Sequence, residues 1–317
     1  DTLPLEAGPR VDRIEARDLN GDGRPDLVVQ NGRDLQVFLQ KEGAFEAKPS
    51  TVLRLDPAVF LWTFGALDGV KLPVVFSQGT RGVQTIPFDG AAFGAPEDRI
   101  VHPTIFEGTC AEGAAPLFLE FAQDFDRDGR SDLLLYREER LFVMKQHPGG
   151  TFRCLQKLPV PTEAVVSIPW SHSQRLTETL SIPVLAFGDT TGDGRMDFSF
   201  YHDESMGTFA QREDGTFGPP SSLAFSEDAK KRRGPRFFQF DVPPRVADFN
   251  GDGLIDVALI YPSKGRVQIY YGRAGRTDFS QPDELMKVAD GWSSGIYLED
   301  LNGDGKLDLI MGVVRKF

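Results

Sequence analysis

A nine-residue acidic stretch occurs five times in this chain and constrains its fold more than any other feature. The copies are DLNGDGRPD at 18–26, DFDRDGRSD at 124–132, DTTGDGRMD at 189–197, DFNGDGLID at 248–256 and DLNGDGKLD at 300–308. Asp stands at positions 1, 5 and 9 of every copy, Gly at position 6, and Asn, Asp or Thr at position 3. An internal repeat of this kind indicates one structural unit that is used several times.

The segments around each copy repeat as well. An apolar or alternating segment precedes the acidic stretch, a strand-like run such as LVVQ or LLLY follows it, and a Gly/Asp turn further on leads to a Phe. These phenylalanines are Phe45, Phe152, Phe217 and Phe279. The pattern predicts a unit of about 50 residues with four strands, in which the acidic stretch is the loop between the first two strands.

The spacing of the copies predicts the number of units. Asp18 and Asp124 are 106 residues apart, which leaves room for two units, and TFGALDGVKLPVVFSQ at 63–78 fits a degenerate copy whose acidic loop has shrunk to Asp68. Short apolar runs bounded by Gly, Pro and Asp, without long helical patterns, indicate an all-β chain. Antiparallel four-stranded units in series are typical of a β-propeller, so we expect six blades, with seven as the alternative.

We therefore expect a single β-propeller domain over residues 1–317. The segment at 2–7 is expected to add an outer strand to the last blade and so close the ring. The expected units lie near 11–56, 57–116, 117–182, 183–243, 244–292 and 293–317.

The acidic loop has the chemistry of a calcium site. Alternating Asp and Asn oxygens on a tight turn suit a hard cation that takes six to eight oxygen ligands, whereas magnesium demands stricter octahedral geometry and zinc would need His or Cys. The ligands expected in the first copy are the side chains of Asp18, Asn20, Asp22 and Asp26 and the backbone carbonyl of Arg24. We expect up to five structural Ca²⁺ ions. The third copy should bind most weakly, because Thr191 stands at its position 3.

The same loop has two other interpretations. An EF-hand needs a bidentate Glu at position 12, where a helix begins. Position 12 is apolar in every copy and lies in a strand-like run, which excludes an EF-hand and argues against a dockerin-type helical pair. The other interpretation is a plain Asx turn, since Asp, Asn and Gly dominate hairpin loops. Turn chemistry, however, needs no Asp at position 9.

These loops, together with downstream turns such as GTF at 150–152 and DGTFG at 214–218, resemble the FG-GAP/VCBS repeat family, which also builds the β-propeller of integrin α-chains. The resemblance covers almost the whole chain, although integrin propellers have seven blades. It implies a protein that acts in adhesion, glycan binding or complex assembly, or in some members as a polysaccharide lyase. The calcium ligands that it implies in the other copies are Asp124, Asp126, Asp128, Arg130 and Asp132; Asp189, Thr191, Asp193, Arg195 and Asp197; Asp248, Asn250, Asp252, Leu254 and Asp256; and Asp300, Asn302, Asp304, Lys306 and Asp308.

Charge and hydropathy argue against several classes of function. The net charge is −12, with 47 acidic against 35 basic residues, so nucleic acid is a poor partner. No apolar run reaches 18 residues, and we expect no membrane span. Numbering from Asp1 is compatible with a processed, secreted chain, and the family resemblance implies an extracellular, cell-surface or periplasmic location.

Catalysis is not expected from the motifs present. No G-x-S-x-G, H-E-x-x-H or phosphate-loop pattern occurs, and the nearest acid–base pair in sequence is His172 with Arg175. We expect a binding module for a protein partner, with a glycan-binding propeller as the alternative and a polysaccharide lyase as the less favoured one. The oligomeric state is left open.

Binding is expected on long insertions between units, at 100–117, 159–183 and 221–245, on the face opposite the acidic loops. The aromatic side chains there could equally pack their own loops onto the blades. Cys110 and Cys154 are compatible with one disulfide or with two buried thiols. The candidate partner-binding residues are Trp170, His172, Arg175, Arg233, Arg236 and Phe237.

Overall fold

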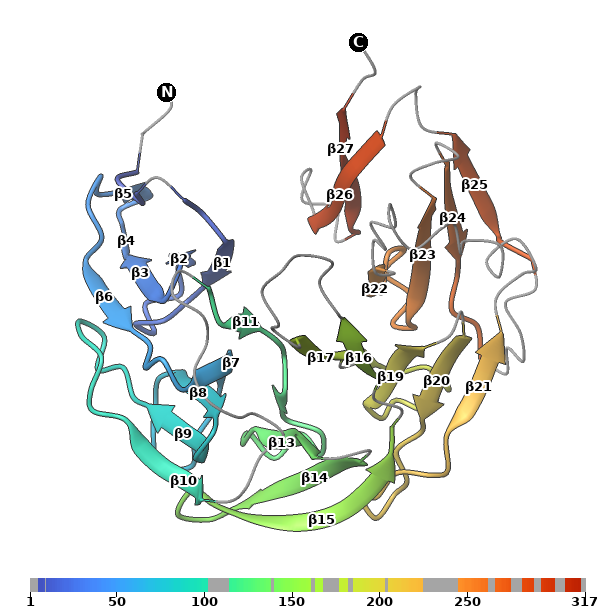
Figure 1. Ribbon diagram of the computed structural model, residues 1–317, viewed down its shortest axis with the longest axis horizontal. Coiled ribbons are helices and arrows are strands. Elements are labelled where there is room, and N and C mark those ends of the chain that lie inside the picture. Colours follow the sequence, from blue (N-terminus) through green and yellow to red (C-terminus); the bar gives the residue numbers. More distant parts are fainter. Residues whose placement is uncertain are drawn as a thin grey trace. The chain divides into compact units, whose positions relative to one another are not determined.

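Every regular element in the described part of the chain is a β-strand, as expected (Figure 1). No helix among the described residues is long and apolar enough to cross a membrane. The chain divides into two compact units, Asp1–Thr162 and Glu163–Phe317. The computed structural model describes residues 5–8, 10–101, 114–137, 140–160, 163–167, 177–181, 185–202, 205–224, 245–261, 266–274, 281–287, 292–299 and 306–314.

The first unit contains three blades of antiparallel strands (Figure 1). Blade one has the order β1-β2-β3-β6, with strands Arg13–Arg17, Asp26–Asn31, Asp34–Phe38 and Thr51–Arg54. Blade two has the order β10-β9-β8-β7-β11, with strands Glu97–Val101, Gly82–Ile86, Val74–Gly79, Val59–Gly65 and Leu117–Phe118, the last of them parallel to β7. Blade three has the order β12-β13-β14-β15, with strands Ala122–Gln123, Asp132–Arg137, Arg140–His147 and Thr151–Pro159. A small hairpin after β3 consists of β4 and β5, Gln40–Lys41 and Ala44–Phe45.

The second unit contains two further blades and two hairpins. Blade four has the order β18-β19-β20-β21, with strands Leu185–Gly188, Asp197–His202, Ser205–Phe209 and Ser221–Ala224. Blade five has the order β22-β23-β24-β25, with strands Arg245–Ala247, Asp256–Tyr261, Arg266–Tyr270 and Glu284–Lys287. The hairpins are β16-β17, Glu163–Ser167 and Thr177–Ser181, and β26-β27, Trp292–Glu299 and Asp308–Val314. The described residues thus form five blades, and a sixth blade stays a prediction.

Burial on both faces explains why the second strands of the blades, such as DLLLYR in β13, lack a regular alternation of apolar and polar residues. All six residues of β8 are buried, and so are five of the six in β13. Strands covered on both faces lose the alternation of apolar and polar residues. Between blades one and two, one core cluster joins Leu19, Val28 and Leu35 to Trp62 and Val75. The core therefore lies between neighbouring blades.

The phenylalanines after the outer turns pack onto their own or neighbouring blades. The ring of Phe217 lies 4.9 Å from that of Phe198, edge to face, and Phe217 is almost fully buried. In blade two the rings of Phe93 and Phe88 are 5.0 Å apart. These contacts hold the third-to-fourth-strand turn against the sheet, which gives a physical reason for the repeated Gly/Phe turns.

The N-terminal segment packs against blade one in its described part. Residues 5–8 form no strand, and Leu5 and Ala7 contact a cluster with Val29 and Phe38. The backbone N–H of Glu6 donates to the Ala47 carbonyl at 2.7 Å. A closing strand from the segment 2–7 on the last blade stays a prediction.

Blade two keeps a loop of full length where we expected a shortened one. Gly65 pairs with Val74 at the base of this loop, as Arg17 pairs with Asp26 in blade one. Residues 66–74 therefore replace the nine-residue acidic stretch one for one. The expectation of a shrunken loop is therefore wrong. The number of residues in the loop fixes the register of the two strands, so the length is kept. The carboxylates do not affect this register and can be lost.

Candidate functional site

Four of the five acidic loops lie within the described residues, and they share one hydrogen-bond pattern. In the first, Asp18 Oδ1 accepts the backbone N–H of Gly21 at 2.7 Å, and Oδ2 accepts that of Gly23 at 2.8 Å. A carboxylate placed just before a turn can satisfy consecutive N–H groups in this way. The bond from the position-6 N–H recurs on Asp124, Asp189 and Asp248. In the fifth loop, only residues 306–308 lie within the described part of the chain.

The turn needs a left-handed backbone at two positions. Position 6 is Gly in all five copies, and Gly23 has φ 82°. Position 4 is left-handed too: Gly21 has φ 76°, and Arg127 takes the same place in blade three with φ 59°. Sequence reasoning missed position 4, although Gly at that position in the other four copies was the signal. Arg127 is strained, because a Cβ disfavours this region.

The position-9 Asp is buried and joins two parts of its own blade through hydrogen bonds to backbone N–H groups on both sides. This arrangement is called the bracket below. Asp26 is fully buried, and its two oxygens accept the backbone N–H groups of Leu19 at 3.0 Å and Gln40 at 2.8 Å. Leu19 belongs to the acidic loop and Gln40 follows the third strand. Asp197 and Asp256 form the same two-sided bracket, and Asp132 accepts the bond from Gln146, which lies near the end of the third strand of its blade. The acidic loop and the outer turn therefore share one end of the blade, as the strand order predicts.

Loops of successive blades within each unit are also joined directly. In the first unit the Ser131 N–H donates to the Ala66 carbonyl at 3.0 Å, and the Gln146 side-chain amide donates to the same carbonyl at 3.1 Å. In the second unit the Ile255 N–H donates to the Asp189 carbonyl at 3.2 Å. The loops therefore form part of the contact between neighbouring blades.

The carboxylates of these loops differ in their protonation equilibria. Burial raises the pKa of Asp132 to about 7, and the charges of Asp128 and Asp124 add to the rise. Burial also raises the pKa of Asp256. At Asp189, burial opposes ionisation, but the backbone N–H groups of its turn together outweigh it and lower the pKa. A cation in the loop would favour the ionised form of all of these groups.

The donor set of positions 1, 3 and 5 fits a hard cation. Asp124, Asp126 and Asp128 each offer a carboxylate oxygen, and these oxygens lie within 4.8 Å of one another. In the first loop the position-3 oxygen comes from Asn20, which accepts the Asp22 N–H at 2.9 Å. Oxygen donors converging on a turn are the ligands that calcium prefers. Position 9 as a ligand, and calcium itself, stay predictions.

A salt bridge within the loop accompanies three of the copies. The position-7 Arg pairs with the position-5 Asp, at 2.7 Å for Arg24 with Asp22 and 2.5 Å for Arg195 with Asp193. The third pair is Arg130 with Asp128. The sequence predicted only the backbone carbonyl of position 7 as a ligand. The structure adds an ion pair made by its side chain. The pair partly neutralises one of the carboxylates of each of these loops.

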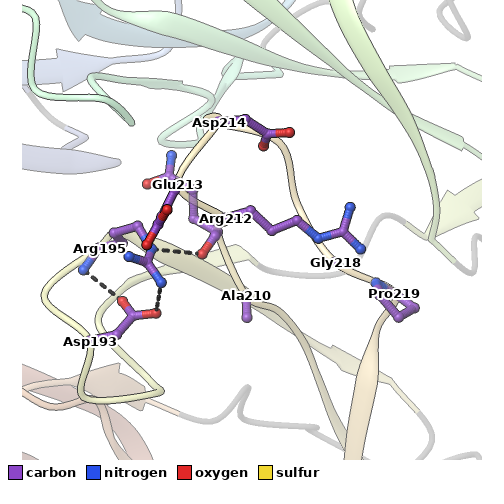
Figure 2. A pocket seen from close by; sticks show the side chains of 9 residues that line it. Asp193, Arg195, Ala210, Arg212, Glu213, Asp214, Gly218 and Pro219 are labelled. Atoms are coloured by element: carbon purple, nitrogen blue, oxygen red, sulfur yellow. Dashed lines mark hydrogen bonds and ion pairs between the residues drawn. The ribbon is translucent and has the colours of Figure 1, made fainter.

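A polar hollow of about 640 Å³ lies beside the acidic loop of blade four (Figure 2). Arg195 forms one wall and is held in place, because its Nε donates to the Gln211 carbonyl at 3.0 Å. Arg212, Glu213 and Asp214, from the turn between β20 and β21, form another part of the lining. Charged groups of both signs thus line a hollow on the same end of the blade as the acidic loop.

None of the six predicted partner-binding residues lies within the described part of the chain. Trp170, His172 and Arg175 belong to the insertion that holds the β16-β17 hairpin. Arg233, Arg236 and Phe237 lie between β21 and β22. The structure therefore leaves their roles as predictions.

The proposed disulfide and the proposed acid–base pair also stay untested. Cys110 lies outside the described residues, whereas Cys154 is exposed on β15, with its Sγ 3.7 Å from the Gln156 carbonyl. Both members of the pair His172 and Arg175 lie outside the described residues.

Residues 248–311, which run from the acidic loop of blade five through the fifth acidic loop, match the family described as FG-GAP-like repeat. No curated protein sequence is significantly similar to the chain. The matched repeat and the blade sheets together support an FG-GAP-type β-propeller.

Solved structures share the fold at low identity. One, from work on the recognition of non-reducing terminal N-acetylglucosamine by an Agrocybe aegerita lectin, is 17% identical with a TM-score of 0.63, and the alignment covers 98% of this chain and 77% of that one. Another, BBS1N in complex with ARL6DN, is 12% identical with a TM-score of 0.51, covering 98% and 78%. At these identities the likeness extends to the fold alone.

Proposed function

We propose that this FG-GAP-type β-propeller is a calcium-stabilised, non-catalytic module that binds a protein partner or assembles into a larger complex. The observation that carries the calcium part is the convergence of the Asp124, Asp126 and Asp128 oxygens on a turn whose pattern recurs in each described copy. Without a cation, each loop holds several like charges close together. Calcium binding and folding should therefore be linked.

The calcium part is tested by chelation. We expect EDTA to lower the melting temperature by about 5–15 °C, in proportion to the binding free energy that is lost. Calcium should restore the original value, whereas magnesium at the same concentration should not. Elemental analysis of the purified protein should find calcium. An unchanged melting temperature, together with protein free of bound metal, would show that the loops are structural turns only.

The proposed partner is a protein that this propeller binds outside the cytoplasm. Propeller blades hold their connecting loops on a rigid scaffold, where binding residues are commonly found. Affinity capture from the native organism, with and without calcium, should retain a specific protein. The variant that tests the candidate contacts should fold but lose the partner. It carries six substitutions to Ala, at Trp170, His172, Arg175, Arg233, Arg236 and Phe237.

A glycan is the second candidate ligand, and one observation favours it. The hollow beside Arg195 combines rigidly held and exposed charged groups with the small residues Ala210 and Gly218, a surface able to hydrogen-bond to hydroxyl groups. A glycan array with Arg212→Ala as the comparison tests this. Binding of glycans alone, with no protein captured, would replace the first candidate by the second.

A further inference from the structure

We infer that Lys145 is a tethered cation that occupies the acidic loop of blade three, so that calcium must displace it to bind there; the inference rests on the proposed calcium function. Lys145 lies on β14, and its ammonium group pairs with Asp126. The same Nζ lies 4.0 Å from Asp128 Oδ2. Both aspartates belong to the oxygen cluster of this loop. The lysine thus lies against the carboxylates that would hold the metal.

Blades one, four and five have no cationic side chain at the position that Lys145 occupies in blade three. The bracket defines equivalent positions, because the residue after Lys145 donates its N–H to the position-9 Asp. The residues one place before the corresponding donors are Leu39, Ala210 and Tyr271 in blades one, four and five. Among the acidic loops that the structure describes in full, only that of blade three therefore has an ammonium group at this position.

Lys145 makes the acidic loop of blade three the least negative of the five. The stretch 124–132 has four aspartates and two arginines, and Lys145 brings its local charge to −1. The stretch 248–256 has three aspartates and no basic residue, which gives −3, because Leu254 stands at position 7. The loop with the most carboxylates is thus the least negative. Since attraction for a divalent cation follows local charge, we expect 248–256 to bind calcium more tightly than 124–132.

Arg130 also neutralises part of the negative charge of the acidic loop of blade three. Its guanidinium pairs with Asp128 and also lies 3.7 Å from Asp68, the one acidic residue in the corresponding loop of blade two. Asp68 Oδ2 in turn accepts the Gly149 N–H at 2.7 Å. The ion pair of Arg130 with Asp68 therefore adds a charged contact between blades two and three beside their hydrogen bonds, with no metal needed.

Calorimetric titration of the chelated protein with calcium chloride tests the inference. Lys145→Met keeps the aliphatic stem and removes the charge. Because a unit charge about 4 Å from a divalent ion opposes binding even when well screened, one site should gain at least about tenfold in affinity. Lys145→Arg, which keeps the charge, should titrate like the wild type. Lys157→Met on the same blade is the matched control and should also be unchanged, since its Nζ lies over the Phe142 ring.

Two further measurements assign the effect to this loop. Adding Asp126→Asn to Lys145→Met should abolish the gain in affinity. In EDTA, Lys145→Met should melt below the wild type, because its carboxylates have lost their counter-ion. Calcium uptake by the wild type with no gain in Lys145→Met would overturn the role of the lysine and leave the calcium proposal intact. Absence of calcium uptake by both proteins would overturn both.

Discussion

The buried carboxylate of Asp26 accepts the backbone N–H of Gln40 at 2.8 Å and so ties the first acidic loop to the turn that follows the third strand. Position 9 looked like a metal ligand from its spacing alone. In the structure, its oxygens satisfy backbone groups of both loops at the same end of the blade. The position-9 Asp is therefore a structural element of the blade whether or not calcium is bound.

Asp26→Asn is expected to destabilise the protein in EDTA as well as in calcium. The side-chain amide would place its N–H₂ group against one of the two backbone N–H donors. That buried donor would then have no acceptor, and the loss of its hydrogen bond to a carboxylate costs about 2–4 kcal/mol. Asp22→Asn at exposed position 5 is the control: in EDTA it should change the stability far less than Asp26→Asn does, and its main effect should appear when calcium is present. Urea denaturation under both conditions measures this. Equal behaviour of the two variants would contradict the bracket.

Stability in EDTA should fall as the pH rises from about 4 to about 7, in part because of Asp132. Burial raises its pKa from the ordinary value of 3.8 to about 7 in the folded protein, so the folded state binds this proton more tightly than the unfolded state. The stabilisation is complete below the lower pKa and is lost as the pH rises through the higher one. Asp132→Asn, which does not titrate, should flatten this part of the profile. A profile identical to that of the wild type would contradict the pKa shift.

Gln146→Ala should weaken the contact between blades two and three. The Gln146 side chain donates to the carbonyls of Ala66 and Ser131 and accepts the N–H of Asp68, so three bonds are lost. The free energy of unfolding should drop by about 2–4 kcal/mol. Gln40→Ala is the matched control, because Gln40 gives the bracket only its backbone N–H. A similar loss in both variants would mean that the side chain of Gln146 does not join the blades.

Arg127→Gly should stabilise the acidic loop of blade three by about 1 kcal/mol. Arg127 has φ 59°, a conformation that is strained for any residue with a Cβ. Gly129→Ala, at φ 85° in the same loop, should have the opposite effect of similar size. Thermal unfolding of both variants in EDTA measures the difference. A destabilised Arg127→Gly would mean that the arginine side chain contributes more than its backbone strain costs.

Much of the blade architecture was predictable from spacing. The runs after each acidic stretch formed β2, β13, β19, β23 and β27, because alternating and apolar β-branched sequences between Gly-rich turns have few other solutions. The segment LFLEFA at 117–122 behaved differently: β11 joins blade two beside β7, and β12 begins blade three. One apolar segment can serve two sheets, and only the packing of neighbouring blades selects between them.

The sequence by itself determined the repeat, the strands on either side of each acidic stretch and the oxygen-rich composition of the loops, since these depend on residues close together in the chain. Only the tertiary structure decided what each acidic side chain contacts. It buried Asp26 against Gln40, placed Lys145 against Asp126, and kept the blade-two loop at full length. Those outcomes depend on backbone N–H groups and side chains from strands about 14–20 residues away, whose approach follows from sheet pairing and blade packing rather than from local pattern.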